Sequence, residues 1–151
     1  MAVVRYHTAK QRHGPVRVDE SAVIERNHVV RLVDGFVVEM VDGADENLAV
    51  AIDFFPDPEW EEGPTAKPAV QLALLGEDFE VELPFETEDS GGVTQAVIGG
   101  GPYDLLAEAG GVVDLDSTTD GVFIPRRLGY GTQLGDLTGT LIGVVTDAAA
   151  F

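Results

Sequence analysis

The chain has 151 residues and a formal charge of −18, from 27 aspartates and glutamates against nine lysines and arginines. Hydrophobic residues make up 44% of it, which is too many for an acidic disordered chain and enough for one folded domain with its own core. Such a negative chain repels phosphate, which excludes nucleic acid and anionic membranes as main partners, and the lack of cysteine excludes disulfides and thiolate chemistry.

Residues 1–20 are predicted to form an extended basic arm, followed by a β-barrel or sandwich domain over residues 21–151. The arm is polar and contains a Gly-Pro break, which favours a linker. Residues 1–31 hold six of the nine cations and have a net charge of +3, whereas residues 32–125 have a net charge of −21. The arm could fold onto its own acidic chain, dock on an acidic neighbouring protein, or meet nucleic acid. The arm residues expected at an interface are Arg5, Lys10, Arg12 and Arg17.

Three strands are predicted between residues 22 and 55. The first is apolar and ends at Asp34-Gly35, a strong signal for a tight hairpin turn. The second runs over residues 36–41, and the third, over residues 48–55, alternates and is rich in valine, isoleucine and phenylalanine. Their regular spacing predicts an antiparallel meander.

Four prolines then interrupt the chain between residues 56 and 68, around an acidic stretch that contains Trp60. Prolines at this density exclude a helix or a central strand, so a surface loop is expected. Trp60 is interpreted either as an anchor at an interface or as a side chain that folds back onto the core of its own loop.

Further strands are predicted over residues 69–75, 79–85, 93–98, 112–115, 122–128 and 140–146. Residues 79–85 alternate strictly between apolar and polar, which is typical of a half-buried strand. Residues 102–109 have an early proline and a Gly-Gly stop, which predict one short helix. The sequence therefore predicts an all-β fold, a small antiparallel β-barrel or sandwich with an extended N-terminal arm and one short helix.

The stretch from Asp114 to Gly121 is the best candidate for a cation site. Its oxygen-bearing residues at alternate positions, followed by glycine, are able to wrap a hard cation such as Ca²⁺, Mg²⁺ or Na⁺. An EF-hand is excluded because Arg127 stands where that loop needs a bidentate glutamate. The alternative is a turn held by bonds between its side chains and backbone. The candidate ligands are Asp114, Asp116, Thr118 and Asp120.

The sequence contains no other set of residues with the types and spacing of a catalytic or cofactor-binding site. The protein is therefore not expected to be an enzyme or to need a cofactor. The glycines at 99–101 precede the predicted helix, but neither phosphate-binding signature is present and Asp104 would repel phosphate. The sequence contains no nucleophile elbow and no helical histidine pair. His28 lies in a strand-like run and is interpreted as packed or exposed rather than as a ligand. No secretion signal or membrane-spanning run is expected.

The acidity itself is interpreted as an adaptation to salt. The chain has only two lysines against seven arginines, and its carboxylates are dispersed rather than gathered in a tail. At molar salt the Debye length is ~3 Å, so repulsion between dispersed carboxylates is largely screened. Few lysines and many dispersed carboxylates resemble proteins of salt-accumulating haloarchaea and their viruses.

The layout as a whole resembles the small β-barrel decoration (cement) proteins on the heads of tailed viruses. The basic arm from Arg5 to Arg17, the hairpin at 29–41, the strand at 47–52 and the glycine-rich section at 121–145 carry this likeness. The resemblance implies a structural virion protein of a haloarchaeal tailed virus, bound to the major capsid protein on the capsid surface and assembled in the host cytoplasm. It also implies a homo-oligomer, with a trimer favoured. The alternatives are a tail-tube or connector subunit, and a cytoplasmic haloarchaeal β-barrel enzyme or ligand-binding module.

Overall fold

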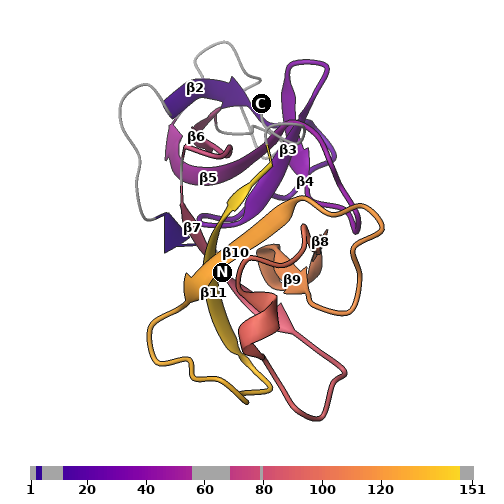
Figure 1. Ribbon diagram of the computed structural model, residues 1–151. Coiled ribbons are helices and arrows are strands. Elements are labelled where there is room, and N and C mark those ends of the chain that lie inside the picture. Colours follow the sequence, from indigo (N-terminus) through magenta and orange to yellow (C-terminus); the bar gives the residue numbers. More distant parts are fainter. Residues whose placement is uncertain (1–2, 5–11, 56–68, 79, 147–151) are drawn as a thin grey trace.

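Two β-sheets, stacked one above the other in the view of Figure 1, make up the fold. A computed structural model describes residues 3–4, 12–55, 69–78 and 80–146. Within these ranges the chain forms strands, connecting loops and two single 3₁₀ turns, so the predicted all-β class is confirmed. No helix in this part of the chain is long and apolar enough to cross a bilayer.

The upper sheet has five strands in the order β2-β6-β5-β3-β4. An isolated bridge between Val18 and Val37, beside a hydrogen bond from the Asp19 N–H to the Val37 carbonyl (2.9 Å), brings the chain after β2 against β4. The two edges of the sheet therefore meet at this point. The strands are β2 (Arg12–Arg17), β3 (Val29–Val33), β4 (Phe36–Glu39), β5 (Leu48–Phe55) and β6 (Ala69–Leu74).

The lower sheet has the order β10-β11-β7-β9-β8, with β1 also paired to β7. The central strand β7 runs antiparallel to β11 and to β1 but parallel to β9. The sheet is therefore mixed rather than wholly antiparallel. Its strands are β1 (Val3–Val4), β7 (Val81–Glu86), β8 (Asp104–Leu106), β9 (Val112–Asp114), β10 (Phe123–Leu128) and β11 (Gly139–Val145).

Two apolar clusters hold the sheets, and the upper sheet contributes to both. Val29, Leu48 and Val50 pack with Leu83 and Phe123 of the lower sheet in a shared core. The alternate residues of the same upper strands, Val30, Ala49, Ala51, Val70 and Leu72, form a second cluster with Val18 and Val37. β5 and β6 contribute side chains to both clusters, and their sequences are nearly continuous apolar runs, as is typical of strands buried on both faces.

Most strand predictions are confirmed, but the predicted meander is wrong. Asp34 and Gly35 both have positive φ angles, of 51° and 84°, as a two-residue hairpin turn between β3 and β4 requires. However, β5 pairs with β3 and not with β4. The connection between β4 and β5 therefore crosses to the other side of β3, which spacing along the sequence does not reveal.

The predicted strand at 93–98 and the predicted helix at 102–109 are both wrong. Gln95–Val97 is a 3₁₀ turn, and 102–109 is divided between β8 and the start of a second 3₁₀ turn, Glu108–Gly110. A helix of about two turns is marginal on its own. Here the same backbone gains more by pairing β8 with β9 across the lower sheet.

The described part of the predicted arm lies within the sheets. Val3–Val4 pairs with β7, and Arg12–Arg17 pairs with β6. Val18, which follows β2, is buried. Residues 12–18 are thus extended, as predicted, but they belong to the body of the protein, which corrects a boundary at residue 20. Residues 5–11 lie outside the described residues.

Candidate interaction surfaces

The loop between β10 and β11, residues 129–138, presents apolar side chains to solvent. Tyr130 is 95% exposed, Leu134 53% and Leu137 54%. They are three of the seven large hydrophobic side chains that are exposed in the described part of the chain. Apolar side chains gathered at one exposed place mark an interaction site more often than scattered ones do. We call residues 129–138 the β10–β11 loop.

The backbone of this loop is fixed by hydrogen bonds, although its apolar side chains are free of the core. Two of these bonds join the loop to Val93, in the connection that follows β7. A loop already held in one conformation loses less entropy when it binds a partner. The bonds run from Thr132 N to Gly129 O (3.1 Å), Asp136 N to Gln133 O (3.1 Å), Gln133 N to Asp136 Oδ2 (2.9 Å), Gly135 N to Val93 O (2.8 Å) and Val93 N to Asp136 O (2.8 Å).

A buried carboxylate lies under the base of the loop. Glu82 of β7 is only 6% exposed, and the Thr140 hydroxyl donates a hydrogen bond to its Oε2. Gly129 lies against both groups, because a Cβ there would be 1.8 Å from Thr140 Oγ1 and 2.6 Å from Glu82 Oε2. Only glycine fits this contact. The strict alternation of residues 79–85 predicts a solvent-facing Glu82, and that prediction is wrong.

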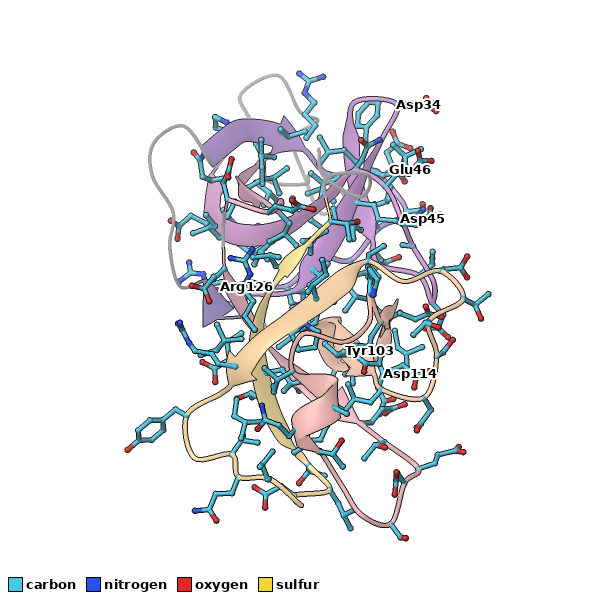
Figure 2. All side chains as sticks on the ribbon, in the orientation of Figure 1. Asp34, Asp45, Glu46, Tyr103, Asp114 and Arg126 are labelled. Carbon is cyan, nitrogen blue, oxygen red and sulfur yellow. The ribbon has the colours of Figure 1, made fainter. Side chains whose placement is uncertain are left out.

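The hairpin that carries the loop is locally basic. Residues 122–146 contain Arg126 and Arg127 against Asp136, a net charge of +1 in a chain of −18. Arg126 is exposed on β10, and Figure 2 shows it on the side of the molecule away from Asp34, Asp45 and Glu46. Arg127 lies 3.5 Å from Glu80, so Arg126 is the exposed cation of this hairpin for which no ion pair is described.

A second surface is a groove of about 460 Å³ between the upper sheet and the 3₁₀ turn Glu108–Gly110. Its apolar residues come from segments that are far apart in the sequence, and it also contains two carboxylates and one histidine. Val23, at 70% exposed, is the most open of its large apolar side chains. The lining residues are Val23, Ile24, Glu25, His28, Val29, Val30, Glu39, Met40, Ala107, Ala109 and Gly110.

His28 shapes one wall of the groove. Its ring packs on Gly110, where a Cβ would lie 2.4 Å from two ring carbons, and its Nε2 is 3.2 Å from Glu25 Oε2. Its side chain is 28% exposed. On the opposite side, Glu39 Oε1 accepts a hydrogen bond from the Val23 N–H (2.7 Å). The groove thus combines an apolar floor with carboxylates fixed at its rim.

The predicted cation turn is held by hydrogen bonds to the protein itself. Asp114 Oδ1 accepts from the Asp116 N–H (2.9 Å), and the Asp116 carboxylate accepts from the Glu88 N–H (2.7 Å) and the Thr87 hydroxyl (3.2 Å). Thr118 is exposed. Across the described ranges, no three His, Cys, Asp or Glu side chains are grouped so as to hold a metal ion. The geometry supports the alternative interpretation, a turn with local bonds.

The residue that organises this turn is Asp104, whose predicted role was only to repel phosphate. It is 7% exposed, and its carboxylate accepts hydrogen bonds from the Ser117 hydroxyl (2.7 Å) and the Asp120 N–H (2.8 Å). Asp104 lies on β8, so it ties the turn to the lower sheet. No sequence signal finds this contact, because the strand that positions Asp104 was predicted as a helix.

Carboxylates crowd together near the end of β7. Burial, followed by the charge of Glu108 and a hydrogen bond to it, raises the pKa of Glu86, and Asp114 and Asp116 add to this effect. The direction is the one expected for like charges gathered at one place. This crowding is a source of repulsion that salt will screen.

The predicted interface residues of the N-terminal segment are only partly described. Arg5, Lys10 and Trp60 lie outside the described residues. Arg12 and Arg17 are the two ends of β2, and Arg17 is half-buried. Whether these residues meet a partner stays a prediction.

The sequence matches no protein-family model and no curated protein, and the structure matches no solved structure. A functional proposal therefore depends on the sequence and geometry of this chain.

Proposed function

We propose that this protein is a structural virion protein of a tailed virus that infects a haloarchaeon, where it decorates and stabilises the capsid. The observation that carries the proposal is the pair of apolar contact surfaces, the β10–β11 loop and the groove, on different parts of an acidic all-β body. Exposed apolar surfaces of this kind suit a subunit that assembles with neighbours. The major capsid protein is the proposed partner, and assembly takes place in the host cytoplasm.

Molar salt decides which contacts hold such an assembly together. Exposed ion pairs are screened within ~3 Å and contribute little there. Apolar burial is strengthened where salts are excluded from the protein surface. Arginines keep part of their value only where a carboxylate holds them bidentately and water is displaced. Apolar contacts therefore supply most of the affinity, and the basic N-terminal residues choose an acidic partner.

A test of the N-terminal residues must leave the strands of both sheets in place. Deleting residues 1–17 would remove both β1 and β2, so loss of binding could simply report a damaged fold. Neutralising Arg5 and Lys10 with glutamine changes charge without removing a strand. Arg26→Gln is the matched control, because Arg26 is 62% exposed and lies 3.5 Å from Asp53.

Binding to undecorated virus heads is measured by co-sedimentation in molar KCl. We expect the Arg5→Gln/Lys10→Gln variant to bind about tenfold more weakly than the wild type, from the loss of charge-assisted hydrogen bonds, and Arg26→Gln to bind normally. Heads that bind the double variant as well as the wild type would contradict the role given to these residues. Failure of the wild type to bind heads would contradict the proposed function.

Two alternatives have distinct signatures. A tail-tube or connector subunit would form rings or tubes, whereas a decoration protein stays a small soluble oligomer, and electron microscopy of the purified chain separates them. A ligand-binding module is favoured by the groove, whose volume of about 460 Å³ lies in the range of small-molecule sites, roughly 300–1,000 Å³. A small molecule that co-purifies with the native protein and is displaced by Val23→Arg would support that alternative.

A further inference from the structure

The β10–β11 loop and the groove lie at different ends of the molecule. In Figure 1 the loop projects from the lower sheet, beyond the arrowhead of β10. The groove is lined instead by residues 23–30, 39–40 and 107–110. The hydrogen bonds to Val93 hold the loop at its own end. A chain therefore presents its loop and its groove at the same time, and the loop is not placed to fill the groove of its own chain.

The two surfaces complement each other in apolar character. The loop offers one aromatic and two leucine side chains that are more than half exposed. The groove offers a floor of valine, isoleucine and methionine and a volume sufficient for side chains of this size. Large aromatic side chains in pockets are the usual anchors of protein interfaces.

Their charges are also complementary. The hairpin that bears the loop has a net charge of +1 along its sequence; Arg127 lies 3.5 Å from Glu80, and Arg126 is exposed on β10. The groove has Glu25 and Glu39 at its rim, and Figure 2 shows Asp34, Asp45 and Glu46 on the same upper sheet region. Of the cations nearby in the sequence, Arg31 donates its Nε–H to the Glu39 carbonyl oxygen (3.0 Å), and Arg26 lies 3.5 Å from Asp53. A second copy of this chain thus supplies both the apolar floor and the acidic rim that the hairpin requires.

We propose that the β10–β11 loop of one copy docks into the groove of a second copy, in a head-to-tail contact. The contact joins two different surfaces, so it forms a ring if the rotation between neighbours closes and a filament if it does not. It is made between copies in solution and does not depend on the proposed function. Molar salt favours it, because its main contribution is apolar burial.

The experiment uses two variants of the full chain, each altered at only one of the two surfaces. The loop variant is Tyr130→Ser/Leu134→Ser, which removes the anchors and keeps the groove. The groove variant is Val23→Arg, which places a cation on the apolar rim and keeps the loop. All three side chains are more than half exposed, so the fold should tolerate both changes. The matched control is Val33→Arg, at a valine that is 41% exposed and lies outside the groove lining.

Molar mass is measured by light scattering and analytical ultracentrifugation in molar KCl. We expect the wild type and Val33→Arg to associate, and each surface variant alone to associate at least about 30-fold more weakly, as loss of an interface hot spot does. An equimolar mixture of the two variants should form a dimer of one chain of each, because one intact loop then meets one intact groove. That dimer cannot grow further.

Several results would overturn the proposal. A monomeric wild type would do so, and so would a surface variant that associates as tightly as the wild type. Two monomeric variants that stay monomeric when mixed would also overturn it, because one intact loop would then have failed to bind one intact groove. Failure to bind virus heads would overturn the proposed function but would leave the result of the mixing experiment unchanged.

Discussion

Replacing Gly92 with alanine is expected to release the β10–β11 loop from the connection that follows β7. Gly92 has a φ of +69°, and a Cβ there would lie 2.3 Å from the Gly135 carbonyl oxygen and 2.5 Å from that of Asp136. Both obstacles are backbone atoms, which a rotamer change cannot move aside. The two segments must therefore separate, which breaks the two hydrogen bonds between Val93 and the loop.

The loss of stability expected for Gly92→Ala is the sum of two separable effects. Holding alanine in a left-handed conformation costs about 1–2 kcal/mol. Two broken backbone hydrogen bonds, at roughly 0.5–1.5 kcal/mol each, add about 1–3 kcal/mol. Gly131→Ala is the matched control, because Gly131 lies in the same loop with a φ of +78° and has no atom within 4 Å of an added Cβ. It should show only the conformational effect.

Urea denaturation at constant molar KCl measures the free energy of unfolding of both variants and the wild type. Gly92→Ala should be destabilised by about 2–5 kcal/mol and Gly131→Ala by about 1–2 kcal/mol. Gly92→Ala should also associate more weakly with a second copy, since its loop is no longer held ready to bind. If the two variants lose equal stability, the hydrogen bonds to Val93 do not hold the loop, and the argument for a fixed loop fails.

Three further predictions concern charge. Because the pKa of Glu86 is raised in the folded state, mainly by burial and by Glu108, its ionised form costs stability above the folded pKa and costs nothing below the unfolded pKa. Glu86→Gln should therefore raise the melting temperature at neutral pH, and a thermal melt series should show this gain disappear as the pH falls through the folded pKa; a gain that persists in acid would contradict it. Asp104→Ala removes the carboxylate that accepts hydrogen bonds from the Ser117 hydroxyl and the Asp120 N–H. Urea denaturation should show the free energy of unfolding lowered by about 3 kcal/mol. An unchanged free energy of unfolding would show that these hydrogen bonds do not stabilise the turn. Lowering KCl from molar to millimolar should destabilise the wild type, and stability that does not fall would refute the interpretation of the acidity as salt adaptation.

The sequence predicted the elements whose signals are local. The hairpin at Asp34-Gly35 needs two residues that tolerate positive φ, and both are present. β5, at 48–55, is rich in β-branched and aromatic residues, as strands are, and its predicted bounds match the structure. Such signals depend only on neighbouring residues, so they survive without knowledge of the fold.

The features that the sequence did not predict depend on contacts between segments that are far apart in the chain. The 102–109 segment has sound local helix signals, but its backbone pairs with β9 instead. Glu82 has the pattern of an exposed residue, and it is buried because Gly129 and Thr140, which are 47 and 58 positions further along the chain, cover it. The groove likewise joins segments near residues 25, 40 and 108.

The candidate site shows the same division. The exposed leucines and tyrosine of the β10–β11 loop are visible in the sequence, but they were counted as part of a glycine-rich section. Their meaning depends on burial, since an apolar residue in a turn is as often packed as exposed. Only the structure separates Tyr130 from the buried side chains of β10 and β11.

Quantitative mass spectrometry of purified virus particles tests the central claim most directly. The chain should be present in the particles in a fixed ratio to the major capsid protein. When it dissociates from the heads, electron microscopy should show that the density decorating their surface is lost as well. A chain that is abundant in the infected-cell lysate but absent from the particles would contradict its role as a virion protein.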